Sequence, residues 1–66
     1  MDIKREFGNN VKTLRLRLGL SQEALALKAG IDRTYLPGIE KGVRNVSIVV
    51  MEKIANALKV SIKDLL

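Results

Sequence analysis

The sequence predicts an all-α domain of about five short helices, and three observations support this. Apolar residues make up 47% of the 66 residues but aromatic residues only 3%, so the core is aliphatic. Apolar positions repeat at helical spacing, and residues typical of helix ends separate the repeats. No run alternates strictly between apolar and polar residues, so strands are not expected. A chain of this length forms one domain, 1–66, with a thin core.

The first helix is expected over residues 3–18, with Asp2 as its N-cap and Gly19 at its end. Gly8 weakens a helix by about 1 kcal/mol relative to alanine, so a close contact is expected there. The basic side chains are expected on the solvent side: Lys4, Lys12, Arg15 and Arg17. The apolar residues share one face: Ile3, Phe7, Val11, Leu14 and Leu18.

The next two helices are expected over about 21–29 and 32–40. Ser21 and Asp32 are their expected N-caps, because short polar side chains accept from the first free N–H groups. Gly30 ends the earlier helix. Pro37 lacks an N–H and would cost about 3 kcal/mol inside a helix beginning at Arg33, unless that helix kinks or begins later.

A loop over 43–46 separates these helices from the last two. Ser47 is the expected cap of a helix that runs to about residue 58. Ser61 and Asp64 have the spacing of a capping box, so a short fifth helix is expected over 61–66. The expected inward residues of the fourth helix are Ile48, Met51, Ile54, Ala55 and Leu58.

Composition excludes several functions. The chain has no cysteine and no histidine, which removes thiol chemistry, the commonest general base and the commonest metal ligands. Seven scattered acidic residues suggest neither a catalytic pair nor a metal site, so neither an enzyme nor a cofactor is expected. A net charge of +5 favours an anionic partner, most often nucleic acid. The charged start and short apolar runs predict no signal peptide or membrane span, consistent with a cytoplasmic protein.

The segment from Ser21 to Glu40 is the most informative part of the chain. It reads as two short helices joined by a few residues around Gly30, and such helices meet at a steep angle. Ala26 is small where the helices cross, and Ile31 can fill the corner. This spacing is that of a helix-turn-helix, in which the later helix enters the major groove of DNA.

The same residues resemble the Xre family, the Cro and lambda-repressor-like helix-turn-helix proteins. The matching runs are Leu14-Arg15, Gly19 to Ala26, Gly30 to Leu36, Gly38 to Gly42, and Met51 to Ser61. The small size, the segment 32–35 and the Arg44-Asn45 loop most resemble controller proteins of restriction–modification systems. The resemblance implies a five-helix lambda-repressor-like domain of bacterial, phage or plasmid origin. It implies a homodimer that binds a pseudo-palindromic operator and represses or activates transcription, in the latter case by touching RNA polymerase.

The resemblance also assigns roles to residues. Base contacts are expected from Arg33, Thr34, Pro37 and Gly38, and an arginine suits the O6 and N7 edge of guanine. Pro37 departs from the family, which usually has a small polar residue there. Contacts to the DNA backbone are expected from Gln22, Tyr35, Lys41, Arg44 and Asn45.

Surplus apolar residues indicate a dimer surface. They lie off the core stripe of the fourth helix or at the chain end: Val49, Val50, Ile62, Leu65 and Leu66. A two-fold patch would place two recognition helices about 34 Å apart, on successive major-groove faces. The simpler alternative is a compact monomer with a few exposed valines.

Other functions remain open at this stage. The chain could be a phage or plasmid repressor or an antitoxin. A helical protein-interaction module with an acidic partner, or an amphipathic membrane binder, would also explain the basic charge. DNA binding is distinguished from these by steep salt dependence and by preference for one site.

Overall fold

A computed structural model describes residues 2–66 and confirms an all-helical chain, with no strand among these residues. The helices are α1 (Ile3–Arg17), α2 (Gln22–Ala29), α3 (Tyr35–Lys41) and α4 (Ile48–Leu58), followed by η1 (Ile62–Leu65). η1 is a single 3-10 turn, so the prediction of a fifth α-helix was wrong. No helix in the described part of the chain is long and apolar enough to cross a membrane.

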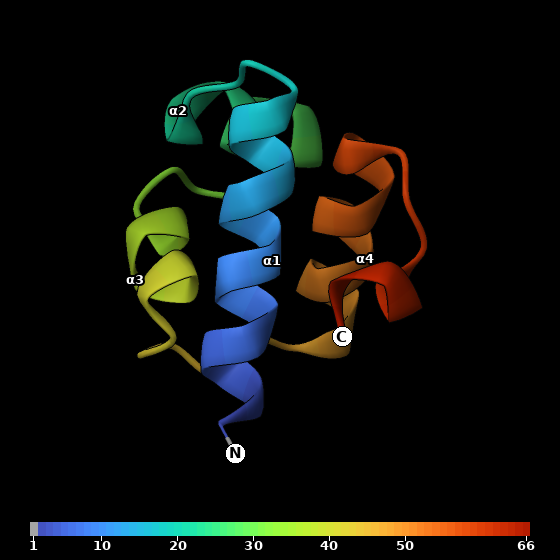
Figure 1. Cartoon of the computed structure of the whole chain (residues 1–66). Coiled ribbons are helices and arrows are strands. Elements are labelled where there is room, and N and C mark those ends of the chain that lie inside the picture. Colours follow the sequence, from blue (N-terminus) through green and yellow to red (C-terminus); the bar gives the residue numbers. More distant parts are fainter. Residues whose placement is uncertain (1) are drawn as a thin grey trace.

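Helix α1 forms the centre of the domain (Figure 1). α3 packs against one side of it, while α4 and η1 lie on the other side, and α2 lies across one end. α2 also packs against α4, which closes the core. The core consists of Phe7, Val11, Leu25, Ala26, Ala29, Leu36, Ile39, Ile54, Ala55, Leu58 and Leu65.

Four of the predicted helix starts are confirmed by side-chain caps. The Asp2 carboxylate accepts from the first turn of α1, and Ser21 Oγ accepts from the Ala24 N–H at 2.9 Å. Ser47 Oγ accepts from the Val50 N–H at 3.2 Å. Ser61 and Asp64 form the predicted capping box. Such caps join residues two or three positions apart, so the sequence alone can predict them.

α3 begins later than the cap signal indicates. The Asp32 carboxylate accepts from the N–H of Thr34 at 2.9 Å and from its hydroxyl at 2.8 Å, which closes a turn over 32–34. Tyr35 is then the first helical residue. Pro37 therefore falls in the first turn of α3, where N–H groups have no intrahelical partner, and its expected cost does not arise.

Gly8 is the predicted point of close approach. A Cβ there would lie 2.0 Å from the carbonyl oxygen of Ile39, because α1 and α3 cross backbone against backbone. This crossing fixes the position of α3, which carries much of the candidate site.

Several apolar residues lie where the sequence did not place them. Ile3, Leu18 and Ile48 were expected to face inward but are 56%, 54% and 71% exposed, because helix ends extend past the small core. The placement of Leu65 in the dimer patch was wrong: it is fully buried, since η1 folds back against α1 and α4. Asn10 Nδ2 donates to the Leu65 carbonyl at 2.9 Å and holds the chain end there.

Candidate nucleic-acid interface

The corner between α2 and α3 presents the candidate base-reading residues. Gly30 adopts φ 70°, in the left-handed region, and reverses the chain after α2. Arg33 and Thr34 then lie exposed in the turn before α3 instead of on its first turn. Pro37 is exposed, whereas Gly38 is half-buried against the side chain of Arg44. The predicted base contacts thus centre on an exposed turn.

Arg33 is paired with Glu23 across this corner. Arg33 Nη1 donates to the Glu23 carboxylate, and the two side chains remain 71% and 69% exposed. Glu23 is the second residue of α2, so the pair links the start of one helix to the turn before the next. Glu23 is one of the seven acidic residues to which the sequence alone assigns no site.

A second arginine–glutamate pair lies inside the protein. Arg15 was expected on the solvated face of α1, but it is only 7% exposed and Glu40 only 9%. Arg15 Nε and Nη2 donate to the two Glu40 oxygens at 2.7 and 3.0 Å. Arg15 Nη1 donates to the Leu20 carbonyl at 2.8 Å. The hydrogen bond to Glu40 raises the pKa of Arg15 above its ordinary value, against the opposing effect of desolvation.

Both buried residues carried a signal that the sequence analysis missed. Arg15 lies one helical turn after Val11, and Glu40 one turn after Leu36. Val11 and Leu36 are fully buried, and residues four apart share a helix face. Two opposite charges on inward faces of neighbouring helices therefore predict a buried ion pair.

Gln22 joins the buried pair to the surface. Its Nε2 donates to Glu40 Oε1 at 3.0 Å, which orients the side-chain amide. A carboxylate accepts only from the NH2 end of an amide, and that nitrogen has a second N–H. This second donor is the group that the predicted phosphate contact needs.

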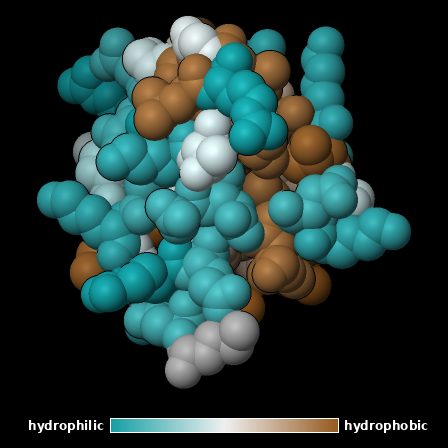
Figure 2. Space-filling view, in the orientation of Figure 1, coloured by the Kyte–Doolittle hydropathy of each residue, from teal (hydrophilic) through white to brown (hydrophobic). Residues whose placement is uncertain are grey.

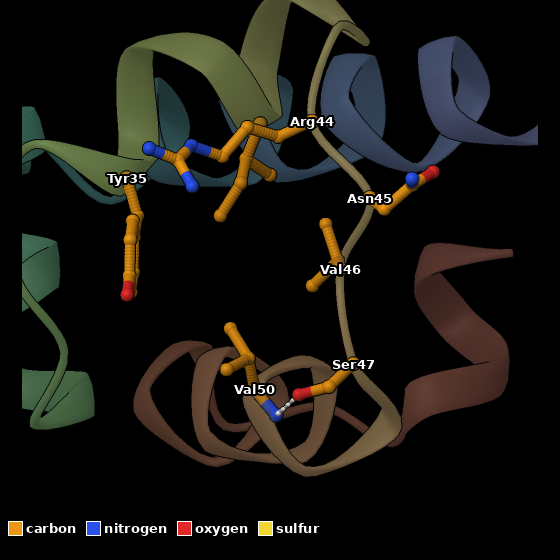
Figure 3. Close-up of a pocket in the computed structure, with 7 residues that line it drawn as sticks. Tyr35, Arg44, Asn45, Val46, Ser47 and Val50 are labelled. Carbon is orange, nitrogen blue, oxygen red and sulfur yellow. Dashed lines mark hydrogen bonds between the residues drawn. The ribbon is translucent and has the colours of Figure 1, made fainter.

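Tyr35 and Arg44 line a hollow of about 190 Å³ between α3, the 43–47 loop and α4 (Figure 3). The Arg44 guanidinium lies 4.5 Å from the centre of the Tyr35 ring, within cation–π range. Asn45 also borders the hollow, but its side chain is turned away from it in Figure 3. Lys41 is exposed beside the start of α1, apart from this hollow.

Asp32 is an acidic residue among these basic ones. Hydrogen bonds from the Thr34 N–H and hydroxyl lower the pKa of Asp32, and the charges of Arg33 and Arg44 lower it further. The Arg44 guanidinium over the ring of Tyr35, the residue that follows this turn, places the turn and the 43–47 loop on the same side of the protein.

The apolar surface lies elsewhere. Figure 2 shows hydrophobic surface beside α4 and a second patch at the end of the domain where α2 lies, while the side of α3 is mostly hydrophilic. Val49 and Leu66 are 59% and 51% exposed, but Val50 and Ile62 are half-buried and pack on the core. Ile3 and Leu66 border one apolar hollow of about 90 Å³. The exposed apolar surface therefore lacks Leu65, which was expected in it, and includes Ile3 and Ile48, which were expected in the core.

Comparison with known proteins gives consistent matches. A family model described as helix-turn-helix matches residues 11–65. Control protein C.MunI of a Mycoplasma species is 48% identical over 97% of this chain and 88% of its own length. Control protein C.BamHI of Bacillus amyloliquefaciens is 47% identical over 98% of this chain and 82% of its own. The structure of the restriction-modification controller protein C.AhdI from Aeromonas hydrophila is similar with a TM-score of 0.90, at 45% identity, and covers 94% of each chain.

Proposed function

The chain belongs to this helix-turn-helix family, and from that membership we propose that it is a transcriptional regulator that binds operator DNA as a homodimer. The relatives named as control proteins, together with the controller structure, favour a restriction–modification controller. A regulator of this kind acts in the cytoplasm. Any contact with RNA polymerase, which activation would require, stays a prediction.

The observation that carries the proposal is the exposed Arg33-Thr34 turn on a rigid frame. The frame is the buried contact of Arg15, Glu40 and Gln22, which joins α1, α2 and α3. We propose that Arg33 and Thr34 read base edges, with a smaller role for Pro37 beside them. Because Gly38 is half-buried, it contributes by letting Arg44 lie close rather than by touching a base.

Backbone contacts would surround the base-reading turn. Gln22 would donate its second N–H to a phosphate, and Tyr35 and Arg44 would meet the backbone from the hollow between α3 and α4. Lys41 and Asn45 add donors at the edge of this surface. Such contacts fix the register of a protein on DNA without selecting sequence.

Selection of bound sites from random duplexes tests the proposal and yields the half-site. Arg33→Ala should lose its base preference at one base pair per half-site. Its affinity for the selected duplex should fall by about 10-fold to 100-fold. Arg44→Ala should weaken binding to every duplex and flatten the salt dependence by about one phosphate contact. Lys53→Ala, which removes one exposed charge from α4, is the matched control and should bind like the unchanged protein. Equal binding to all duplexes would refute the proposal.

We propose that the dimer surface is the apolar face beside α4. Val49, Leu66, Ile48 and Ile3 form its exposed part, and Val50 and Ile62 support it from below. Val49→Glu should give a monomer in sedimentation analysis and a large loss of operator affinity. Leu16→Glu is the matched control, because Leu16 is equally exposed, at 58%, on α1. A Val49→Glu protein that stays dimeric would place the interface elsewhere.

A further inference from the structure

We propose that Glu23 is a specificity-determining residue: it orients Arg33 for guanine, while its charge weakens binding to every sequence. The inference rests on the proposed function, because it takes Arg33 as the base-reading side chain. It is carried by the ion pair at the helix-turn-helix corner and by the exposure of both partners.

The pair is poorly placed for a role in stability. Its side chains are 71% and 69% exposed, and ion pairs this open to water contribute little to folding. Glu23 also lies in the first turn of α2, next to the residue expected to bind phosphate. A carboxylate at that position repels the DNA backbone, so it carries a cost for DNA binding in general.

The geometry of the guanidinium shows how Glu23 can orient Arg33 toward guanine. Arg33 Nη1 donates to Glu23, which leaves the N–H groups of Nη2 and Nε free. These two nitrogens form one edge with two parallel donors, matching the O6 and N7 acceptors of guanine. Arg33 therefore can bind Glu23 and guanine together. Adenine offers N7 but places a donor at its 6-position, so it cannot satisfy both N–H groups.

Specificity then results from the orientation of Arg33 by Glu23, because only guanine satisfies both N–H groups of the remaining edge. On a site without guanine, the Glu23 charge opposes the phosphates and Arg33 gains nothing in return. On a site with guanine, the bidentate contact outweighs the repulsion. The repulsion is the same for both sites and cancels in their comparison, so Glu23 raises selectivity through the orientation of Arg33 and lowers affinity overall through its charge.

The test uses the full chain and a duplex selected by the unchanged protein from a random pool. The same duplex with guanine replaced by adenine at the Arg33-dependent position is the comparison. Glu23→Gln should bind the adenine duplex about 3-fold to 10-fold more tightly, while guanine binding changes less, so discrimination falls several-fold. Glu52→Gln, an exposed acid on α4, makes the same change in net charge and should leave discrimination unchanged.

A double-mutant cycle separates orientation from plain charge. In an Arg33→Ala background, Glu23→Gln should no longer alter discrimination, because the side chain that it orients is absent. Unchanged discrimination in the single Glu23→Gln variant would overturn the inference. An equal change with and without Arg33 would also overturn it. The proposed function fails separately, if the unchanged protein selects no sequence; in that case this inference fails with it.

Discussion

The two arginine–glutamate pairs of this domain have the same chemistry and opposite surroundings. The side chains of Arg15 and Glu40 are 8% and 3% exposed, and their pair has further hydrogen bonds to Gln22 and the Leu20 carbonyl. The side chains of Arg33 and Glu23 are about 70% exposed and face water. The first pair connects three helices, whereas the second lies on the surface proposed to meet DNA. Burial decides which pair holds the fold and which stays accessible to DNA.

This difference separates the frame from the reading residues. A buried charge pair is rigid, because breaking it leaves an uncompensated charge away from water. An exposed pair contributes little to the fold, because water and salt screen each partner, but its outer donors stay accessible to DNA. A DNA reader needs both properties in neighbouring side chains. Two adjacent residues at the start of α2 connect to the two pairs. Gln22 donates to Glu40 of the buried pair, and Glu23 is the acid of the exposed pair.

Removal of the buried carboxylate should have the largest effect. Glu40→Ala leaves Arg15 buried without its partner and should lower the free energy of unfolding by about 3–5 kcal/mol. Urea unfolding followed by circular dichroism measures this. Glu52→Ala, at an exposed site, is the control and should stay within about 0.5 kcal/mol. A loss below about 1 kcal/mol for Glu40→Ala would mean that the buried pair does not hold the frame.

Separation of α1 from α3 should have the next largest effect, because these helices carry the two halves of the buried pair. Gly8→Ala places a Cβ 2.0 Å from the Ile39 oxygen, so the two backbones must move apart. We expect a loss of about 1–3 kcal/mol, although alanine is the better helix former. Asn9→Ala, at the next and exposed position, should be neutral or stabilising. A stabilised Gly8→Ala protein would contradict the close crossing.

The exposed pair should affect stability little. Glu23→Ala should lower the free energy of unfolding by less than about 1 kcal/mol, including the lost charge at the start of α2. Repeating the urea titration in about 1 M salt should shrink this difference, since salt screens exposed charges. A loss as large as that of Glu40→Ala would remove the contrast between the two pairs.

The smallest effect on stability is expected from substitution of Asp32, and it depends on pH. Hydrogen bonds from Thr34 lower the pKa of Asp32 from 3.8, so its contribution to stability is complete above that pH. The contribution is lost as pH falls through the lower, folded value. Asp32→Asn should therefore lower stability slightly at neutral pH, where the contribution of the carboxylate is complete, and flatten the decline in stability below pH 3.8. Urea titrations across that range measure the difference; an unchanged acid profile would show that the turn does not depend on the carboxylate.

The sequence predicted local features of the fold better than distant contacts. The caps at Ser21 and Ser47 involve residues three apart, and the chain reversal at Gly30 depends on one residue. The burial of Leu65 depends instead on η1 folding back onto α1, which no neighbouring residue signals. At the candidate site, the exposure of Arg33 was predicted. Its partner Glu23 was not, because ten positions and a chain reversal separate the two.

The ring of Tyr35 gives the domain an optical probe of its own. Tyr35 is the single tyrosine in a chain without tryptophan, so the near-ultraviolet emission of the folded protein comes mainly from this position. The ring lies under the Arg44 guanidinium at the edge of the hollow. Displacement of that guanidinium by a phosphate would change the emission. Unlabelled protein thus reports, through one side chain, whether a duplex has reached this face.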